Sequence, residues 1–88
     1  MSKNPKSESM ESLINAYISR ELIRKPEFQL KNDTPLLESK IIDSIALLKL
    51  VIFLEKQFGL VLDPEELIPE NFKTIDVICI YVRSKQGK

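Results

Sequence analysis

Ser44 combines a reactive hydroxyl with a position in the chain that could expose it. It follows Asp43 and opens the most apolar helical pattern of the sequence, residues 44–58. The first amides of a helix have no partner within the helix, and the helix dipole favours negative charge there. A phosphate ester on Ser44 would therefore be well placed to accept hydrogen bonds from these amides. A simpler interpretation remains open, because Asp and Ser are common residues at helix starts and could serve only as a cap.

The composition argues against catalysis by the chain itself. The sequence contains no histidine and only one cysteine, Cys79. These counts remove the usual general base near neutral pH, the Ser-His-Asp and Cys-His pairs and the commonest metal ligand. A tetrahedral zinc site is also hard to build from such a set. We therefore expect neither catalytic residues nor a metal site, and Cys79, among apolar neighbours, is predicted to be a buried small hydrophobic residue.

Two long helices are predicted in the first two thirds of the chain. Apolar residues recur at helical spacing from Ser9 to about Arg24, where Pro26 should end the helix. The second helix should run from Ser44 to Phe58, capped by Asp43 and stopped by Gly59. Between them, residues 27–42 are predicted to form a long ordered loop pinned by buried leucines.

The last third of the chain is predicted to add one short helix and one longer helix. Asp63 and Pro64 form a helix start with glutamate three residues after the cap, and Pro69 stops this helix soon afterwards. The last helix should run from Thr74 to about Ser84, although many of its residues are β-branched. The predicted fold is all-α: a small four-helix bundle of three main helices, one short helix and a long first loop.

The predicted helix 44–58 has two apolar stripes. At 100° per residue, one stripe contains Leu47, Leu50, Val51, Leu54 and Phe58, and the other contains Ile45, Leu48 and Ile52. Its clearly polar side carries Lys49 and Lys56. One stripe should be buried in the core. The other should offer a docking surface built on Leu48 and Ile52, with Leu47 as a further contributor.

Length and charge limit the domain organisation and the partners. The 88 residues form one domain at most, predicted as a flexible tail over 1–8, a domain over 9–84 and a flexible tail over 85–88. Thirteen basic and thirteen acidic residues cancel, which favours neither nucleic acid nor membrane as partner. The polar first nine residues and the single cysteine predict a cytoplasmic protein. We expect a monomer.

Several motifs together resemble the acyl and peptidyl carrier protein family. Asp43-Ser44-Ile45 matches the motif that opens the family's second helix, and Leu54-Glu55-Lys56-Gln57-Phe58-Gly59 matches the end of that helix. Asp63-Pro64-Glu65-Glu66-Leu67 is similar to the short third helix, and Thr74-Ile75 with Tyr81-Val82 to the fourth. The resemblance covers residues 10 to 84.

This resemblance implies a specific modification. A magnesium-using phosphopantetheinyl transferase would transfer 4'-phosphopantetheine from coenzyme A to Ser44, and the thiol of the arm would hold cargo as a thioester. Asp43 matches the acidic residue before the family's serine, which implies a role in transferase recognition. Further partners would be a loading enzyme, either an adenylating enzyme or an acyltransferase, and downstream biosynthetic enzymes. The reactive sulfur would then belong to the cofactor.

The sequence departs from the family pattern at two places. Glycine often precedes the family's Asp-Ser by two or three residues, whereas this chain has Lys40-Ile41-Ile42. Carriers of bacterial fatty acid synthesis usually have an acidic second helix, whereas this one carries Lys49 and Lys56 with Glu55 alone. Because charge governs partner choice, this favours a stand-alone carrier of acyl, aminoacyl or aryl groups for a dedicated pathway. The alternative is an unmodified helical adaptor that binds a partner protein. A helix-turn-helix DNA binder fits less well, because the basic residues are scattered.

Overall fold

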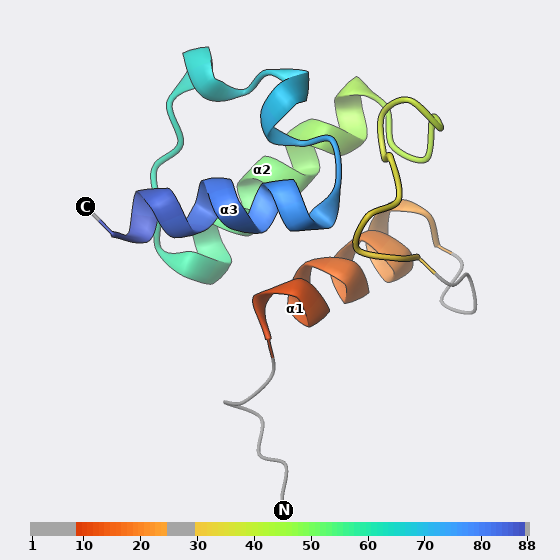
Figure 1. The fold of residues 1–88 in the computed structure, drawn as a ribbon, viewed down its shortest axis with the longest axis horizontal. Helices are drawn as coiled ribbons and strands as arrows, with labels where there is room; N and C mark the ends of the chain where they lie inside the picture. The colour runs from red at the N-terminus through yellow and green to blue at the C-terminus, as the bar shows by residue number, and fades with distance from the viewer. Residues whose placement is uncertain (1–8, 25–29, 88) are drawn as a thin grey trace, which may run out of the picture.

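The first helix starts at a serine cap and ends in a wider form of helix. The computed structural model describes residues 9–24 and 30–87 (Figure 1). Helix α1 spans Met10–Tyr17, and the Ser9 hydroxyl accepts a hydrogen bond from the Ser12 N–H at 3.0 Å. The chain continues as a π-helical segment, η2, over Ile18–Leu22. The position of the predicted helix is therefore confirmed, although its last part is π-helical and not α-helical. Pro26, predicted to end it, lies outside the described residues.

Helix α2 has the bounds that the sequence predicts, Ser44–Phe58. At its start, the Asp43 carboxylate accepts a hydrogen bond from the Ala46 N–H at 2.8 Å. At its end, Gly59 takes the left-handed conformation with φ of 66°, which glycine adopts without steric cost. Both ends are therefore fixed by local chemistry that the sequence carries.

The segment after α2 forms two 3₁₀ turns rather than one short α-helix. These are η3, Pro64–Glu66, and η4, Pro69–Asn71, each with proline at its start. The predicted cap at Asp63 is wrong, because its side chain makes no capping hydrogen bond. The Asp63 carboxylate instead accepts a hydrogen bond from the Lys85 ammonium at 3.3 Å. The tertiary contact with the last helix replaces the local cap.

Helix α3 spans Ile75–Gln86, and the Thr74 hydroxyl accepts the Val77 N–H at 3.1 Å. It ends two residues beyond the predicted end, so Lys85, assigned from sequence to a tail, lies in its last turn. Its β-branched residues do not prevent the helix because several of them are fully buried, and packing outweighs intrinsic propensity there.

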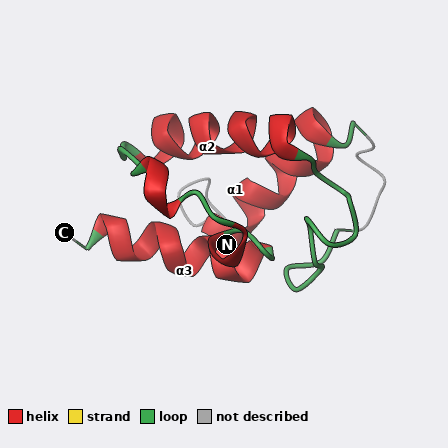
Figure 2. Cartoon of the chain, turned by 90° about the horizontal axis from the view of Figure 1, so that it is seen from above, coloured by secondary structure: helices red, strands yellow, loops and turns green. Residues whose placement is uncertain are grey.

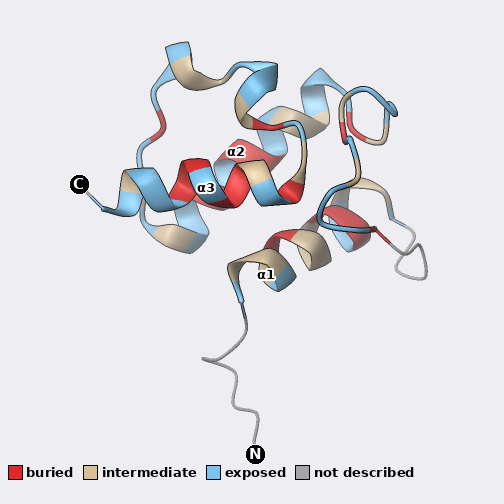
Figure 3. Ribbon diagram, in the orientation of Figure 1, coloured by how far each residue is buried: buried red, intermediate tan, exposed pale blue. Residues whose placement is uncertain are grey.

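The three helices enclose one hydrophobic core. Seen from above, α2 and α3 lie along opposite sides of the molecule, and α1 runs obliquely from the α3 side toward the α2 side (Figure 2). Buried positions are concentrated where these helices face one another (Figure 3). The fully buried side chains include Ile14, Ile18, Leu36, Leu50, Leu54, Phe72, Ile75, Ile78 and Val82. None of the helices in the described residues is long and apolar enough to cross a bilayer.

The first loop is tied to α3 before it leads into α2. The Leu36 N–H donates to the Lys73 carbonyl at 2.8 Å, and the Asp76 N–H donates to the Asn32 carbonyl at 3.0 Å. Leu36 is fully buried and Ile42 is 2% exposed. The prediction of an ordered loop pinned by buried leucines is confirmed for residues 30–42, while residues 27–29 lie outside the described part. The loop therefore fixes where α2 begins.

Candidate functional site

Ser44 is exposed at the first position of α2, where the loop meets the helix (Figure 1). Asp43 supplies the cap: its carboxylate accepts the Ala46 N–H, and its carbonyl accepts the Leu47 N–H at 2.8 Å. Within residues 9–24 and 30–87, the N–H groups of Ser44 and Ile45 donate to no protein acceptor. The cap is thus provided by Asp43, and the Ser44 hydroxyl is left open to solvent.

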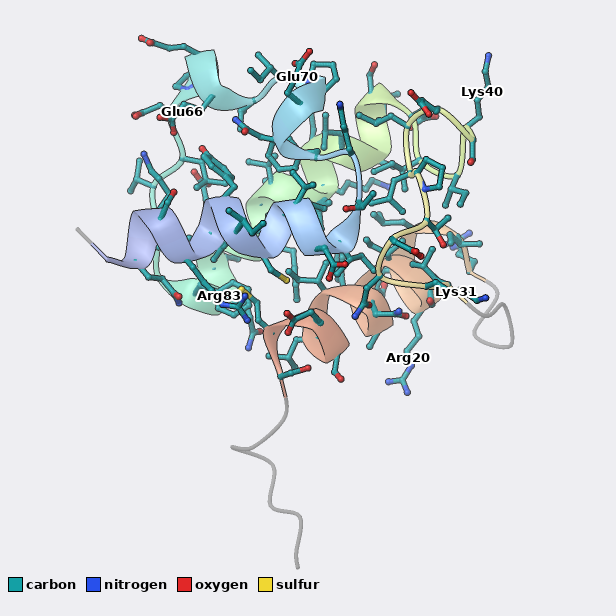
Figure 4. All side chains as sticks on the ribbon, viewed as in Figure 1. Arg20, Lys31, Lys40, Glu66, Glu70 and Arg83 are labelled. Carbon is teal, nitrogen blue, oxygen red and sulfur yellow. The ribbon has the colours of Figure 1, made fainter. Side chains whose placement is uncertain are left out.

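The turn that presents Asp43 and Ser44 is built on a left-handed residue. Lys40 has a φ of 60°, a conformation that residues with a Cβ atom seldom take. Its N–H donates to the Leu37 carbonyl at 3.0 Å, and the Ile41 N–H donates to the Leu36 carbonyl at 3.0 Å. Lys40 therefore takes a conformation that suits glycine, in the region where the family often has glycine, and its side chain points outward (Figure 4).

The two stripes of α2 lie as predicted. Leu50, Val51 and Leu54 are buried, whereas Ile45, Leu48 and Ile52 are 67%, 58% and 52% exposed. Leu47 is half-buried and packs against the core, so the third exposed member of the outer stripe is Ile45. The helical period alone already indicated that Ile45, and not Leu47, belongs to the exposed stripe, because it places Ile45 beside Ile52 and away from Leu47.

A hollow of about 340 Å³ lies beside the start of α2. It is lined by Glu21, Leu22 and Arg24 from the end of the first helix, and by Asp43, Ile45, Ala46 and Lys49 from the start of the second. Ser44 is not among its lining residues. Ser44 is itself exposed, so a large donor molecule could approach it from solvent.

Cys79 and Tyr81 lie in the core, which makes them unsuited to a second reactive site. Cys79 is fully buried, and this burial raises the pKa of its thiol to about 11. Burial also raises the pKa of Tyr81, whose hydroxyl donates to the Glu66 carboxylate at 2.8 Å. In the described parts of the chain, no group of three metal-ligating side chains lies close together. Ser44, in contrast, is exposed at the start of α2.

The surroundings of Ser44 fit a phosphodiester. An anion on its oxygen would lie at the positive end of the 15-residue helix α2. The N–H groups of Ser44 and Ile45 lack protein acceptors within the described residues, as a phosphate-binding helix start requires.

Comparisons with known proteins agree with this geometry. The family model described as the phosphopantetheine attachment site matches residues 14–82, which include Asp43 and Ser44. A solved structure entitled "Crystal structure of FAD-dependent dehydrogenase" contains a chain that is 26% identical, with a TM-score of 0.71. The alignment covers 77% of this chain and 96% of that one, so the two are of similar size. A comparison with curated proteins found no match. The chain belongs to the phosphopantetheine-binding carrier family, whose domains carry 4'-phosphopantetheine covalently.

Proposed function

We propose that this chain is an acyl carrier protein that carries its 4'-phosphopantetheine arm on Ser44. The observation that supports this most strongly is the exposed Ser44 hydroxyl at the first position of α2, beside an aspartate that already caps the helix. The arm would hold acyl, aminoacyl or aryl intermediates as thioesters for the enzymes of a dedicated pathway. We propose further that it works as a monomer in the cytoplasm.

In the transfer of phosphopantetheine from coenzyme A, this chain supplies the nucleophile and holds it in an exposed position. The Ser44 oxygen bonds to the phosphorus that bears pantetheine, and the pyrophosphate P–O bond of coenzyme A breaks, so the adenosine bisphosphate leaves. The hydroxyl proton passes to a base of the transferase, because this chain has no histidine to take it. Asp43 holds the Ala46 N–H at 2.8 Å, and its exposed position supports a role in transferase recognition.

The partner enzymes follow from the carrier function. A phosphopantetheinyl transferase installs the arm, and a loading enzyme, adenylating or acyl-transferring, attaches the cargo. The similar solved structure is named for an FAD-dependent dehydrogenase, which supports a flavin enzyme among the downstream partners. Such an enzyme would take two hydrogens from the thioester-bound cargo and reduce its FAD.

Intact-protein mass spectrometry tests the attachment. The purified chain, incubated with coenzyme A, magnesium and a broad-specificity phosphopantetheinyl transferase, should gain the mass of one phosphopantetheine. Ser44→Ala should gain nothing, whereas Ser39→Ala should behave like the parent chain, since Ser39 is also an exposed serine near this site. A mass gain that persists in Ser44→Ala would refute the proposed attachment residue.

An unmodified adaptor is the second candidate function. The exposed residues Ile45, Leu48 and Ile52 favour it, because such a surface can bind a partner without any cofactor. Failure of several different transferases to modify the folded chain would support this adaptor. Complete modification by any of them would exclude it as the whole function.

A further inference from the structure

The segment between α2 and α3 forms a strap with few buried side chains. This strap, residues 60–71, leaves the end of α2, passes through η3 and η4 and returns to the start of α3 (Figure 1). Leu62, 4% exposed, is the single buried side chain of the strap, whereas Val61 and Ile68 are 82% and 43% exposed. A segment with few buried contacts opens at a lower free energy than the core does. The strap therefore depends on polar contacts to stay in place.

Glu66 ties the strap to α3. The Tyr81 hydroxyl donates to the Glu66 carboxylate at 2.8 Å, and the Lys85 ammonium donates to it at 3.0 Å. Lys85 also donates to the Asp63 carboxylate at 3.3 Å. Tyr81 is buried, and its ring lies edge-on to the Phe72 ring with the centroids 5.7 Å apart. The Glu66 carboxylate is thus held by a donor whose own position is fixed by the core.

Glu55 ties the beginning of the strap to α2. Its carboxylate accepts the Leu62 N–H at 2.9 Å. Within the strap, the side-chain amide of Asn71 donates to the Glu66 carbonyl at 2.7 Å, and this hydrogen bond joins η4 to η3. The two 3₁₀ turns are therefore linked to each other, while side-chain hydrogen bonds attach them to the helices.

The two ends of the strap can act as hinges. Gly59 lies directly before it and, apart from its chain neighbours, no heavy atom lies within 4 Å of the position that a Cβ atom would take there. A glycine backbone changes conformation at little steric cost. At the other end, Phe72 is fully buried and anchors the chain before α3. The strap can therefore swing while the residues on either side keep their places.

We propose that the strap opens as a unit away from α2 and α3 while the three helices stay folded, and that the contacts of Glu66 set how often it opens. Breaking these contacts frees η3, and the hydrogen bond between Asn71 and Glu66 carries η4 along. The open strap exposes Leu62 and the half-buried Leu67, so the open chain presents apolar side chains that the closed chain covers. This inference does not depend on the modification of Ser44.

Hydrogen exchange of the backbone amides, followed by NMR at several low urea concentrations, tests the inference. The N–H groups of Leu67 and Asn71 donate to carbonyls within the strap, those of Pro64 and Ile68. These two amides should exchange about tenfold faster than the amide of Leu54 in α2. Their exchange should also depend little on urea, because a local opening exposes little surface.

Two variants weaken the contacts of Glu66 in different ways. Tyr81→Phe removes one donor and keeps the ring, and Glu66→Gln removes the charge that pairs with Lys85. Each should raise the exchange rates of the strap amides about tenfold, as the loss of a hydrogen bond to a charged group does. Glu65→Gln is the matched control and should leave these rates unchanged, because the exposed Glu65 forms no hydrogen bond or ion pair with the described residues.

A variant in the core separates opening of the strap from unfolding of the whole chain. Ile14 on α1 is fully buried, so Ile14→Val weakens the core without changing the strap. The open strap leaves the contacts of Ile14 in place. The amide of Leu54 should therefore exchange several-fold faster in this variant, while the strap amides keep the rates of the parent chain.

Three results would overturn the inference. The first is exchange of the strap amides with the rate and urea dependence of Leu54, and the second is an equal acceleration of both in Ile14→Val. The third is an equal response of the strap amides to Glu66→Gln and Glu65→Gln. Circular dichroism checks that the variants are folded, and loss of the helical signal in Glu66→Gln and Tyr81→Phe would likewise show that the strap does not open separately from the helices.

Discussion

Asp43 has a structural role that is visible and a recognition role that is proposed. Its carboxylate accepts the Ala46 N–H at 2.8 Å and thereby caps α2. The same exposed carboxylate lies directly beside Ser44, the proposed site of transferase action. Asparagine keeps an oxygen that can accept the capping hydrogen bond but removes the negative charge. The two roles can therefore be separated by substitution.

We predict that Asp43→Ala lowers the free energy of unfolding by about 1 kcal/mol, while Asp43→Asn changes it little, because asparagine is an equally good cap. Urea denaturation measures this difference. The kcat/KM for phosphopantetheine transfer should fall several-fold in both variants, because both lack the charge. If Asp43→Asn had the same kcat/KM as the parent chain, Asp43 would cap the helix but would have no role in transferase recognition.

Cys79 gives the stability of the fold a dependence on alkaline pH. Burial raises the pKa of its thiol from 9.0 to about 11, and the nearby Glu11 carboxylate acts in the same direction. The unfolded chain therefore loses this proton at lower pH than the folded chain does. The contribution of Cys79 to stability is fully present below pH 9 and is lost as the pH rises toward 11.

We predict that urea midpoints of the parent chain fall between pH 9 and 11, and that they fall less steeply in Cys79→Ala. Tyr17 and Tyr81, whose pKa values burial also raises, are present in both chains, so their contribution is removed by the comparison. The parent chain and the variant are compared at each pH, which also removes the cost of the smaller side chain. Identical pH slopes would show that the thiol does not titrate as described.

At the scale of the helix, one side of α2 packs in the core and the other side is exposed to possible partners. Leu54 and Leu48 are the same residue type, six positions apart on one helix, yet Leu54 is fully buried and Leu48 is 58% exposed. The pair therefore tests the division of the helix with matched chemistry. Leu54 belongs to the core that holds the fold, and Leu48 to the stripe that we assign to partners.

We predict that Leu54→Ala lowers the free energy of unfolding by about 2–5 kcal/mol, because it removes buried methyl groups and leaves a cavity. Leu48→Ala should change it by less than about 0.5 kcal/mol, as surface substitutions usually do. Chemical denaturation of the two variants measures this. A large loss of stability in Leu48→Ala would mean that the outer stripe packs within the molecule.

The bounds of helix α2 could be predicted to the residue from the sequence. The form of the segments before and after it could not, because different interactions determine them. Asp43 and Gly59 act on the backbone beside them, so a local pattern is sufficient. The π-helical form of Ile18–Leu22 has no such local marker. Asp63 likewise carries the signature of a helix cap, but Lys85, 22 residues away, takes its carboxylate instead. Local chemistry predicts an element until a distant group offers a competing contact.

At the scale of the molecule, α3 connects the segments that surround it. Arg83 reaches from α3 to the Glu11 carboxylate on α1 at 3.2 Å (Figure 4). Lys85 joins α3 to Glu66 in η3 at 3.0 Å. The backbone just before α3 also accepts the Leu36 N–H of the first loop. The residues in each of these contacts are far apart in sequence, so local sequence patterns could not predict the contacts.

The anchoring of the first loop extends its influence to Ser44. Leu36 is fully buried, its N–H donates to the Lys73 carbonyl, and its own carbonyl accepts the Ile41 and Ile42 N–H groups. It therefore fixes the turn that leads into Asp43 and Ser44. If this placement matters for modification, loosening Leu36 should slow the reaction beyond any general loss of stability.

We predict that Leu36→Ala lowers the free energy of unfolding by about 2–5 kcal/mol and also slows phosphopantetheine transfer to the folded fraction. Leu54→Ala is the matched control, because it makes a similar cavity in α2 without loosening the loop. Transfer rates are compared where circular dichroism shows both variants folded, with Leu36→Val as the milder change if Leu36→Ala does not fold. Equal rates for the Leu36 and Leu54 variants would show that the loop does not position Ser44, and the transferase would then have to recognise α2 alone.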